Sequence, residues 1–314
     1  MEESVKQTTN TILMIEPVSF GFNNQTAVNN YFQQKDSLSD FEVQRRALAE
    51  FNSMVEKLRS KGIRVIVVQD MPEPHTPDSI FPNNWISFHQ DGRVVLYPMY
   101  AENRRAERRN DILTLLAGKV AISDIVDFAA SEKQNRFLEG TGSMIFDHSN
   151  KIAYAAISER TDKELFLHFC HDFDFKPVYF FANQTFTGKR LPIYHTNVMM
   201  CIGDQYAVFC PAAIDNVEER NAVINSFVTS KKEIIEISEE QMHRFACNML
   251  QVENENGVRF LVMSEAAFES LTAKQIERLT SYNEIISIAI PTIEKYGGGS
   301  VRCMMAEIFN NNNL

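Results

Sequence analysis

The chain has 314 residues, of which 44% are hydrophobic and 23% charged, and its formal net charge is -10. This composition is typical of a soluble globular protein, and the acidic balance argues against nucleic acid or an anionic membrane as the main partner. No apolar run reaches the length of a membrane span, and the polar start MEESVKQTTN is unlike a secretory signal. We therefore expect a cytoplasmic protein.

The cysteines are odd in number, and no two of them have the spacing of a metal site: Cys170, Cys201, Cys210, Cys247 and Cys303. Cys201 and Cys210 lie in the apolar runs VMMCI and AVFCP, where a free cysteine behaves as a small hydrophobe. This usage favours buried thiols in a reducing compartment over a disulfide framework.

The first third of the chain predicts a tail, a strand, a helix and a second strand. Residues 1–10 are expected to be disordered, and TILMIEP after them predicts a strand. From Phe41 to Ser60 apolar residues recur at helical spacing, and Gly62 is suited to end that helix. The next run, IRVIVVQ, predicts a strand.

A strand-turn-strand pattern then recurs four times, at Trp85–Met99, Ser143–Ile157, Val198–Ile214 and Cys247–Met263. Helical segments tend to follow these hairpins. The clearest begins at TDKE, residues 161–164, which predicts a capping box with Thr161 as the N-cap, and the strand KPVYFFAN comes after it.

The unit of hairpin, helix and strand can be counted about five times when the opening strand is included. Such units bury their apolar faces only against their neighbours, so the repeat predicts a closed, radial α/β architecture. No Pro/Ser-rich linker divides the chain. We expect one domain over residues 11–309, with tails at 1–10 and 310–314.

Four loops at strand ends carry the residues suited to catalysis or substrate binding: PDSIFPNNW (77–85), FLEGTGS (137–143), YHTN (194–197) and GGGSVRC (297–303). In a radial fold such loops converge, which would bring Glu139, His195 and Cys303 together. A cysteine can act as the nucleophile, a histidine as the proton shuttle, and a carboxylate as the group that orients the histidine. A neighbouring cation such as Arg302 would favour the thiolate form of the cysteine. The glycine run before Cys303, taken by itself, also fits a flexible exit loop followed by a cysteine of the core.

These loops resemble the motifs of the guanidino-group-modifying enzymes, the pentein superfamily. GGGSVRCM resembles the glycine-rich cysteine loop of this superfamily, FLEGTG its Glu-Gly-Gly motif, and YHTNV its histidine loop. ISERT, residues 157–161, resembles the arginine-bearing segment, and PDSIFPNNW resembles the substrate-clamping loop. The motifs occur in family order over most of the chain, and the resemblance implies a five-bladed α/β propeller, the pentein fold.

The resemblance also implies roles for individual residues and a small arginine-like or citrulline-like amino acid as partner. Cys303 would attack the guanidino or ureido carbon, His195 would transfer protons, and Glu139 would support His195 or the substrate nitrogens. Contacts with substrate are implied for a further set of residues: Asp78, Asn83, Asn84, Arg104 or Arg105, Arg160, Asn197 and Arg302. No metal or organic cofactor is implied, and a homodimer is left open.

This chain departs from the family pattern where carboxylates are expected around a cationic guanidinium. Asn83 and Asn84 stand in the clamping loop, Asn197 in the histidine loop, and Gly142 where an aspartate is common. An amide offers a donor and an acceptor to a neutral group, whereas a buried cation needs opposite charge. A neutral ureido substrate therefore fits better than arginine.

We expect hydrolysis of citrulline to ornithine, ammonia and carbon dioxide through a covalent adduct on Cys303. Two other reactions stay open: hydrolysis of arginine or methylated arginine, as in arginine deiminases and dimethylargininases, and amidino transfer to an amine. An inactive binding module is a further alternative, disfavoured because the chain retains Cys303, His195 and Glu139.

Overall fold

The computed structural model describes residues 5–309 and contains, within that range, five three-stranded sheets and one two-stranded sheet. Along the chain the three-stranded sheets are β17 (Ala306–Ile308), β1 (Thr11–Glu16) and β2 (Arg64–Gln69); β3 (Ile86–Phe88), β4 (Arg93–Leu96) and β5 (Asp124–Asp127); β6 (Met144–Asp147), β7 (Ile152–Ala156) and β8 (Lys176–Phe180); β11 (Met200–Ile202), β12 (Tyr206–Phe209) and β13 (Glu233–Glu236); and β14 (Leu250–Glu253), β15 (Arg259–Ser264) and β16 (Glu284–Ile288).

The five sheets share one topology. In each, the first two strands pair antiparallel and the third pairs parallel with the second, as in β3–β4 and β4–β5. A parallel neighbour requires a crossover connection, and the chain makes it with the segment that follows each hairpin. The four predicted hairpins and the unit of hairpin, helix and strand are therefore confirmed.

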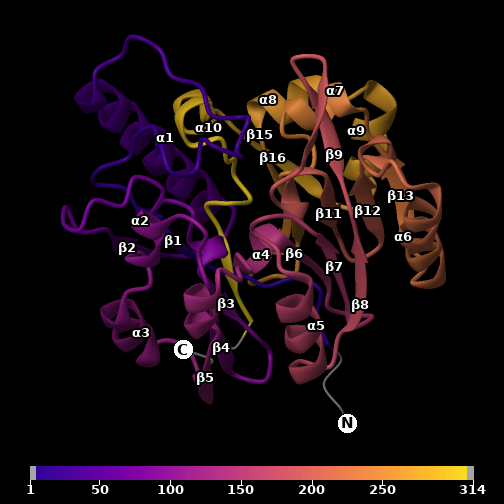
Figure 1. Cartoon of the computed structure of the whole chain (residues 1–314), viewed down its shortest axis with the longest axis horizontal. Coiled ribbons are helices and arrows are strands. Elements are labelled where there is room, and N and C mark those ends of the chain that lie inside the picture. The colour runs from indigo at the N-terminus through magenta and orange to yellow at the C-terminus, as the bar shows by residue number, and fades with distance from the viewer. Residues whose placement is uncertain (1–4, 310–314) are drawn as a thin grey trace.

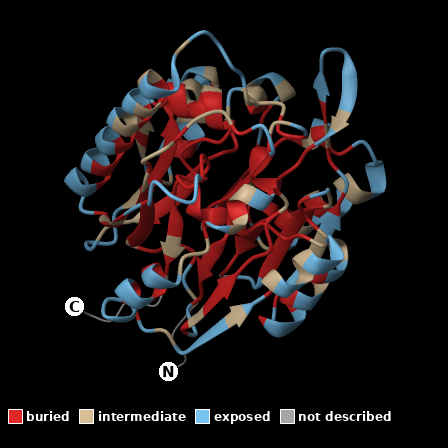
Figure 2. Cartoon of the chain, turned by 60° about the vertical axis from the view of Figure 1, so that its left-hand side comes forward, coloured by how far each residue is buried: buried red, intermediate tan, exposed pale blue. Residues whose placement is uncertain are grey.

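The longer helices lie in these crossovers, as Figure 1 shows for α1, α3, α5 and α6 at the rim of the molecule. The helices are α1 (Asp40–Ser60), α2 (Glu102–Arg105), α3 (Asn110–Ala117), α4 (Gly140–Ser143), α5 (Lys163–Asp172), α6 (Val217–Thr229), α7 (Glu239–His243), α8 (Glu265–Ser270), α9 (Ala273–Thr280) and α10 (Pro291–Gly297). The outer faces of the longer helices are exposed, and most of the strand residues toward the centre are buried (Figure 2), although β5 is largely exposed. Within residues 5–309 no helix is long and apolar enough to cross a membrane.

The helix α1 confirms the prediction for the first third of the chain. Its apolar residues at helical spacing, among them Phe51 and Leu58, are buried, and Gly62 after its end has a φ of +77°. A residue with a Cβ is strained at that φ, which is why glycine is favoured just beyond a helix end.

The N-cap of α5 differs from the prediction. Asp162, rather than Thr161, is the N-cap, and its carboxylate accepts from the backbone N–H of Leu165 at 2.9 Å. Thr161 is instead bridged to Leu138 and Ser158 in extended backbone, which holds it outside the helix. The sequence pattern placed the cap one residue early because both residue types are good N-caps.

The predicted N-terminal tail is wrong for part of its length. Gln7, Thr8 and Thr9 are buried, and the Gln7 amide donates to the backbone oxygen of Phe146 at 3.0 Å. Two other parts of the tail predictions, residues 1–4 and 310–314, lie outside the described residues.

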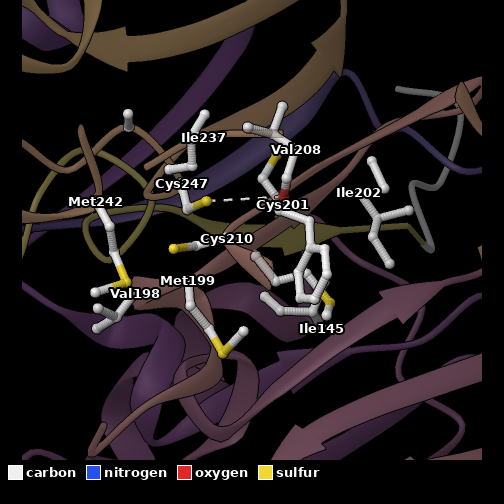
Figure 3. Packing of buried hydrophobic residues seen from close by; sticks show 14 of the residues in the cluster. Ile145, Val198, Met199, Cys201, Ile202, Val208, Cys210, Ile237, Met242 and Cys247 are labelled. Atoms are coloured by element: carbon white, nitrogen blue, oxygen red, sulfur yellow. Dashed lines mark hydrogen bonds between the residues drawn. The ribbon is translucent and has the colours of Figure 1, made fainter. Parts of the chain in front are cut away.

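The two ends of the described chain meet in one sheet, because β17 pairs antiparallel with β1. β17 also contacts β3, and β6 and β14 both contact β11. The space between these strands is filled with apolar side chains. Figure 3 shows one such cluster, in which Cys201, Cys210 and Cys247 lie among Ile, Val and Met side chains. Cys201 and Cys210 are free and buried, as the sequence indicates, and Cys247 is free and buried as well.

Candidate active site

Three of the four predicted loops line one small cavity, and the fourth supplies Glu139, which is bonded to His195. The cavity lining includes the key polar side chains of these three loops: Asp78 and Asn84, His195, and Cys303. The volume is ≈ 20 Å³, which is room for about one water molecule. Residues more than two hundred positions apart in the chain are thus brought together, as the sequence predicts.

The glycine-rich loop delivers Cys303 to this cavity. Gly298 has a φ of +62° directly after α10, a conformation that turns the chain sharply and that favours glycine. At Gly297 and Gly299 an added Cβ would lie 2.7 Å and 2.9 Å from the ring of Phe81. The clamping loop and the cysteine loop therefore approach so closely that side chains larger than hydrogen do not fit between them.

His195 is held by Glu139. Its Nε2 lies 2.7 Å from Glu139 Oε2, and both side chains are buried. Burial would raise the pKa of Glu139, but the charge of Arg160 and the hydrogen bond from His195 lower it to about 2. Burial lowers the pKa of His195 to about 4, although Glu139 opposes this change. At neutral pH the ring is therefore uncharged, with Nε2–H donating to the carboxylate and Nδ1 free to accept a proton.

Asn84 lies beside the His195 ring, and its amide is locked in one orientation. Arg104 Nη1 donates to Asn84 Oδ1 at 2.8 Å, so this atom is the oxygen and the amide nitrogen points the other way. An added Cβ at Gly142 would lie 2.4 Å from Asn84 Nδ2 and 2.7 Å from His195 Nδ1. Both nitrogens therefore lie close to Gly142, on the side where a larger residue would have its side chain. Asn84 Nδ2 is buried and has no hydrogen-bond partner among the described residues.

Arg104 is fully engaged by the protein. Its guanidinium makes a two-point ion pair with Glu107 through Nε and Nη2, both at 2.9 Å, and Nη2 also donates to the Phe81 carbonyl at 3.2 Å. Together with the bond to Asn84, these contacts use its donors in a buried setting. Arg104 therefore acts here as the residue that orients Asn84.

Asp78 and Arg160 line the cavity and contact the segment between β1 and α1. Asn23 donates to Asp78 Oδ2 at 2.7 Å, whereas Asp78 Oδ1 is buried without a partner among the described residues. Burial raises the pKa of Asp78, although the charge of Arg104 opposes this change. The Arg160 guanidinium donates to the side-chain oxygen of Asn29, at 2.9 Å from Nε.

The sulfur of Cys303 lies between two buried amides. Asn197 Nδ2 is 3.3 Å from Sγ and Asn248 Nδ2 is 3.2 Å from it. Asn197 Oδ1 is buried and without a partner among the described residues. Unpaired buried polar atoms are rare in folded proteins, and three of them, Asp78 Oδ1, Asn84 Nδ2 and Asn197 Oδ1, belong to residues at this site. These three atoms are therefore the polar atoms of the site that no described protein group engages.

A family model described as N,N dimethylarginine dimethylhydrolase, eukaryotic, matches residues 16–310 of the chain. The chain belongs to this family. It is therefore a member of the pentein superfamily, which contains hydrolases that act on guanidino C–N bonds. No curated protein matches the sequence.

Solved pentein structures share the fold. ArgZ, an arginine dihydrolase from the ornithine-ammonia cycle in Cyanobacteria, matches with a TM-score of 0.73 at 17% identity, covering 97% of this chain and 41% of ArgZ. A substrate-bound mutant of the ArgZ N-terminal domain matches with a TM-score of 0.70 at 18% identity, covering 96% of this chain and 98% of the domain. A dimethylarginine dimethylaminohydrolase adduct matches with a TM-score of 0.65 at 14% identity, covering 96% of this chain and 100% of that one. This chain thus spans under half of full-length ArgZ.

Four residues expected to contact substrate in this pentein do not line the cavity, and one of them, Asn197, contacts the Cys303 sulfur instead. The Arg105 side chain donates to the backbone oxygens of Met99 and Tyr100. Arg302 turns away from the neighbouring Cys303 and donates to Glu307 at 3.1 Å. Asn83 is buried behind the lining, and its side-chain amide has no partner among the described residues. The guanidinium groups of Arg105 and Arg302 are thus bonded to backbone oxygens and, for Arg302, to a carboxylate, and neither side chain lines the cavity.

Sequence reasoning missed two contributions to the site. Asn248 lies directly before the first strand of the fourth hairpin. Other site loops also lie directly before a hairpin, and this common position is the signal that could have identified Asn248. The second is the polar run NNQTAVNN, residues 23–30, whose Thr26 and Asn30 line the cavity. Its lack of helical or strand periodicity marks a loop, but nothing in the sequence says which loop it meets. Among residues 5–309, no cluster of three or more His, Cys, Asp or Glu side chains could hold a metal ion.

Proposed function

We propose that this pentein hydrolyses the ureido group of citrulline, giving ornithine, ammonia and carbon dioxide. The observation that carries the proposal is the fixed amide of Asn84, which presents an unpaired N–H donor beside His195. Asn197, next to Cys303 but outside the cavity lining, has a buried and unpaired acceptor, Oδ1, while its nitrogen contacts the sulfur. A ureido group offers the complement of this pair, a carbonyl oxygen and an N–H₂.

The guanidinium of arginine does not offer that complement. It has five N–H donors and no acceptor, so Asn84 Nδ2 would face another donor in a buried site. The charge balance supports the same reading. Of the two carboxylates at the site, Glu139 is already bonded to His195 and lies 3.6 Å from Arg160 Nη1. A buried cationic group would find only Asp78 to balance it.

The reaction follows from these positions. The Cys303 sulfur attacks the ureido carbon as the thiolate, and neutral His195 Nδ1 takes up, by way of water, the proton that the thiol has given up. The bond from that carbon to the ornithine nitrogen then breaks as His195 returns the proton to the leaving amine, which leaves an S-carbamoyl group on Cys303. Water, deprotonated by His195, cleaves the carbon–sulfur bond and releases carbamate, which decomposes to ammonia and carbon dioxide.

The amino acid end of citrulline would be bound by the other two charged residues of the lining. The Arg160 guanidinium is shaped for the α-carboxylate, and Asp78 Oδ1 for the α-amino group. In the structure Asn29 and Asn23 bond to these same two residues. Because the cavity holds about one water molecule, substrate entry requires the segment between β1 and α1 to move aside.

Hydrolysis of arginine or a methylated arginine is the second candidate, favoured by the family model and by the presence of Asp78 and Glu139 in the site.

We also propose that the five three-stranded sheets close around one axis as a five-bladed propeller, supported by the contacts of β17 with β3 and of β11 with β6 and β14. In this proposal residues 11–309 form the single catalytic domain of a cytoplasmic enzyme that needs no cofactor.

A panel assay of the purified protein tests the function. Citrulline, arginine, dimethylarginine and agmatine are incubated separately, and ornithine, citrulline and ammonia are quantified, with Cys303→Ser as the control. We expect ornithine and ammonia in equal amounts from citrulline, and no product with the variant. Citrulline formed from arginine or dimethylarginine, with no turnover of citrulline itself, would establish the second candidate instead.

A further inference from the structure

The nucleophile of the proposed reaction differs from the other buried cysteines in what surrounds its sulfur. Cys201, Cys210 and Cys247 lie among apolar side chains, and burial raises the pKa of the Cys201 thiol to about 12 and that of Cys210 to about 11. The Cys247 thiol donates to the Val208 carbonyl at 3.7 Å. Cys303 is also buried, yet its sulfur accepts from two amide N–H groups.

The amide of Asn248 is the better fixed of the two donors. Its Oδ1 accepts from the backbone N–H of Arg302 at 3.0 Å, so the nitrogen must be the atom that points at Sγ, 3.2 Å away. Arg302 directly precedes Cys303 in the same turn, and the Cys303 N–H donates to Ser300 at 3.0 Å. The donor and the sulfur are thus tied to one short stretch of backbone, which makes their geometry independent of the substrate.

Two N–H donors aimed at a sulfur favour the thiolate, because a neutral thiol is a weak acceptor and a charged sulfur a strong one. The charge of Arg302 does not supply this stabilisation, since its guanidinium donates to Glu307 and to the Met305 carbonyl. A cationic substrate would stabilise a thiolate by its own charge. A neutral ureido substrate brings no such charge, so the protein has to provide the donors itself.

We propose that Asn248 is a catalytic residue that, together with Asn197, stabilises the Cys303 thiolate before substrate binds. This inference rests on the proposed function in taking Cys303 as the nucleophile and a neutral ureido group as its substrate. Asn248 contacts the reacting atom directly, and its role is to keep the sulfur ionised in a site from which most water is excluded. Asn197 adds the second donor and keeps its oxygen for the substrate.

Alkylation of the full-length protein by iodoacetamide tests the inference without any substrate. The rate of modification at Cys303 is followed by peptide mass spectrometry across a pH series, for wild type, Asn248→Asp and Asn248→Ala. Asn248→Asp keeps the acceptor for the Arg302 N–H and replaces the donor with a charge that repels the thiolate. Asn283→Asp is the matched control, because Asn283 is another buried amide, bonded to Tyr206 and Leu279.

We expect Asn248→Asp to slow alkylation at neutral pH by at least about tenfold, a factor that a lost charge-assisted hydrogen bond accounts for, with the rate recovering at higher pH. Asn248→Ala should show a smaller loss in the same direction, and in turnover its kcat should fall more than its KM rises. Asn283→Asp should alkylate as wild type does. Alkylation by Asn248→Asp that equals or exceeds the wild-type rate at neutral pH would overturn the inference and leave Asn248 a structural residue.

A second measurement covers the case in which the variants do not fold. The ultraviolet absorbance of the thiolate is compared between wild type and Cys303→Ser at neutral pH, where we expect the difference of one thiolate. No difference, with Cys303 alkylating as slowly as the buried cysteines, would overturn the inference. Slow turnover of citrulline combined with rapid, Asn248-dependent alkylation would count against the proposed function and support the inference.

Discussion

Asn84→Asp should move the preference of the enzyme from a ureido toward a guanidino substrate. The change keeps the size of the side chain and the oxygen that accepts from Arg104 at 2.8 Å, so the new carboxylate is paired and the fold should tolerate it. It converts the unpaired Nδ2 donor beside His195 into an acceptor. The citrulline carbonyl would then face an oxygen, whereas a guanidinium N–H would gain a partner.

The size of the effect follows from one buried hydrogen bond. Leaving a buried acceptor unpaired costs about 1–3 kcal/mol, so kcat/KM for citrulline should fall by roughly 10- to 100-fold. The same carboxylate should raise kcat/KM for arginine or a methylated arginine, so the ratio of the two substrates changes by more than either value. Steady-state release of ornithine and ammonia measures this ratio for wild type and variant.

Asn256→Asp is the matched control, since Asn256 is exposed in a hairpin turn and the substitution adds the same charge far from the cavity. It should leave both substrates unchanged. If Asn84→Asp keeps the wild-type preference for citrulline, while its thermal unfolding shows an intact fold, then the amide of Asn84 does not select the substrate and the complementarity argument is refuted.

Two further predictions concern packing and protonation. Gly142→Ala should reduce kcat/KM by about 100-fold, because the new Cβ would lie 2.4 Å from Asn84 Nδ2 and 2.7 Å from His195 Nδ1 and displace both. The same overpacking should lower the free energy of unfolding by about 1–3 kcal/mol, which leaves a folded protein to assay. Gly118→Ala, with no atom within 4 Å, is the control, and equal activity of the two variants would contradict the prediction. His89→Phe should flatten the loss of stability in acid. Burial lowers the pKa of His89 to about 3, so below about pH 6.5 the unfolded chain binds a proton that the folded chain does not, and the free energy of unfolding falls as the pH falls through this window. The variant's slope in urea unfolding should be smaller by about 1.4 kcal/mol per pH unit, and parallel slopes would show that His89 is protonated in the folded state as well.

The repeated elements could be predicted from the sequence because their signals are local. The alternation and turn residues of a hairpin, and the helical spacing in Phe41–Ser60, lie within short stretches of chain. The positive φ of Gly298 is also a local requirement, whereas the need for glycine at 297 and 299 comes from their close approach to Phe81, which is a tertiary contact. Errors arose where two neighbouring residues are equally suited locally, as with Thr161 and Asp162 at the start of α5.

The sequence by itself determined the order of the units, the site loops and the residue types in them, because periodicity and turn chemistry act over a few residues. Only the tertiary structure decided which neighbour of a pair faces the cavity: Asn84 rather than Asn83, and Arg104 rather than Arg105. It alone showed that Asn248 reaches the Cys303 sulfur. The physical reason is that the direction of a buried polar side chain is set by partners far away in the chain, such as Arg104 for Asn84, and no local pattern records them.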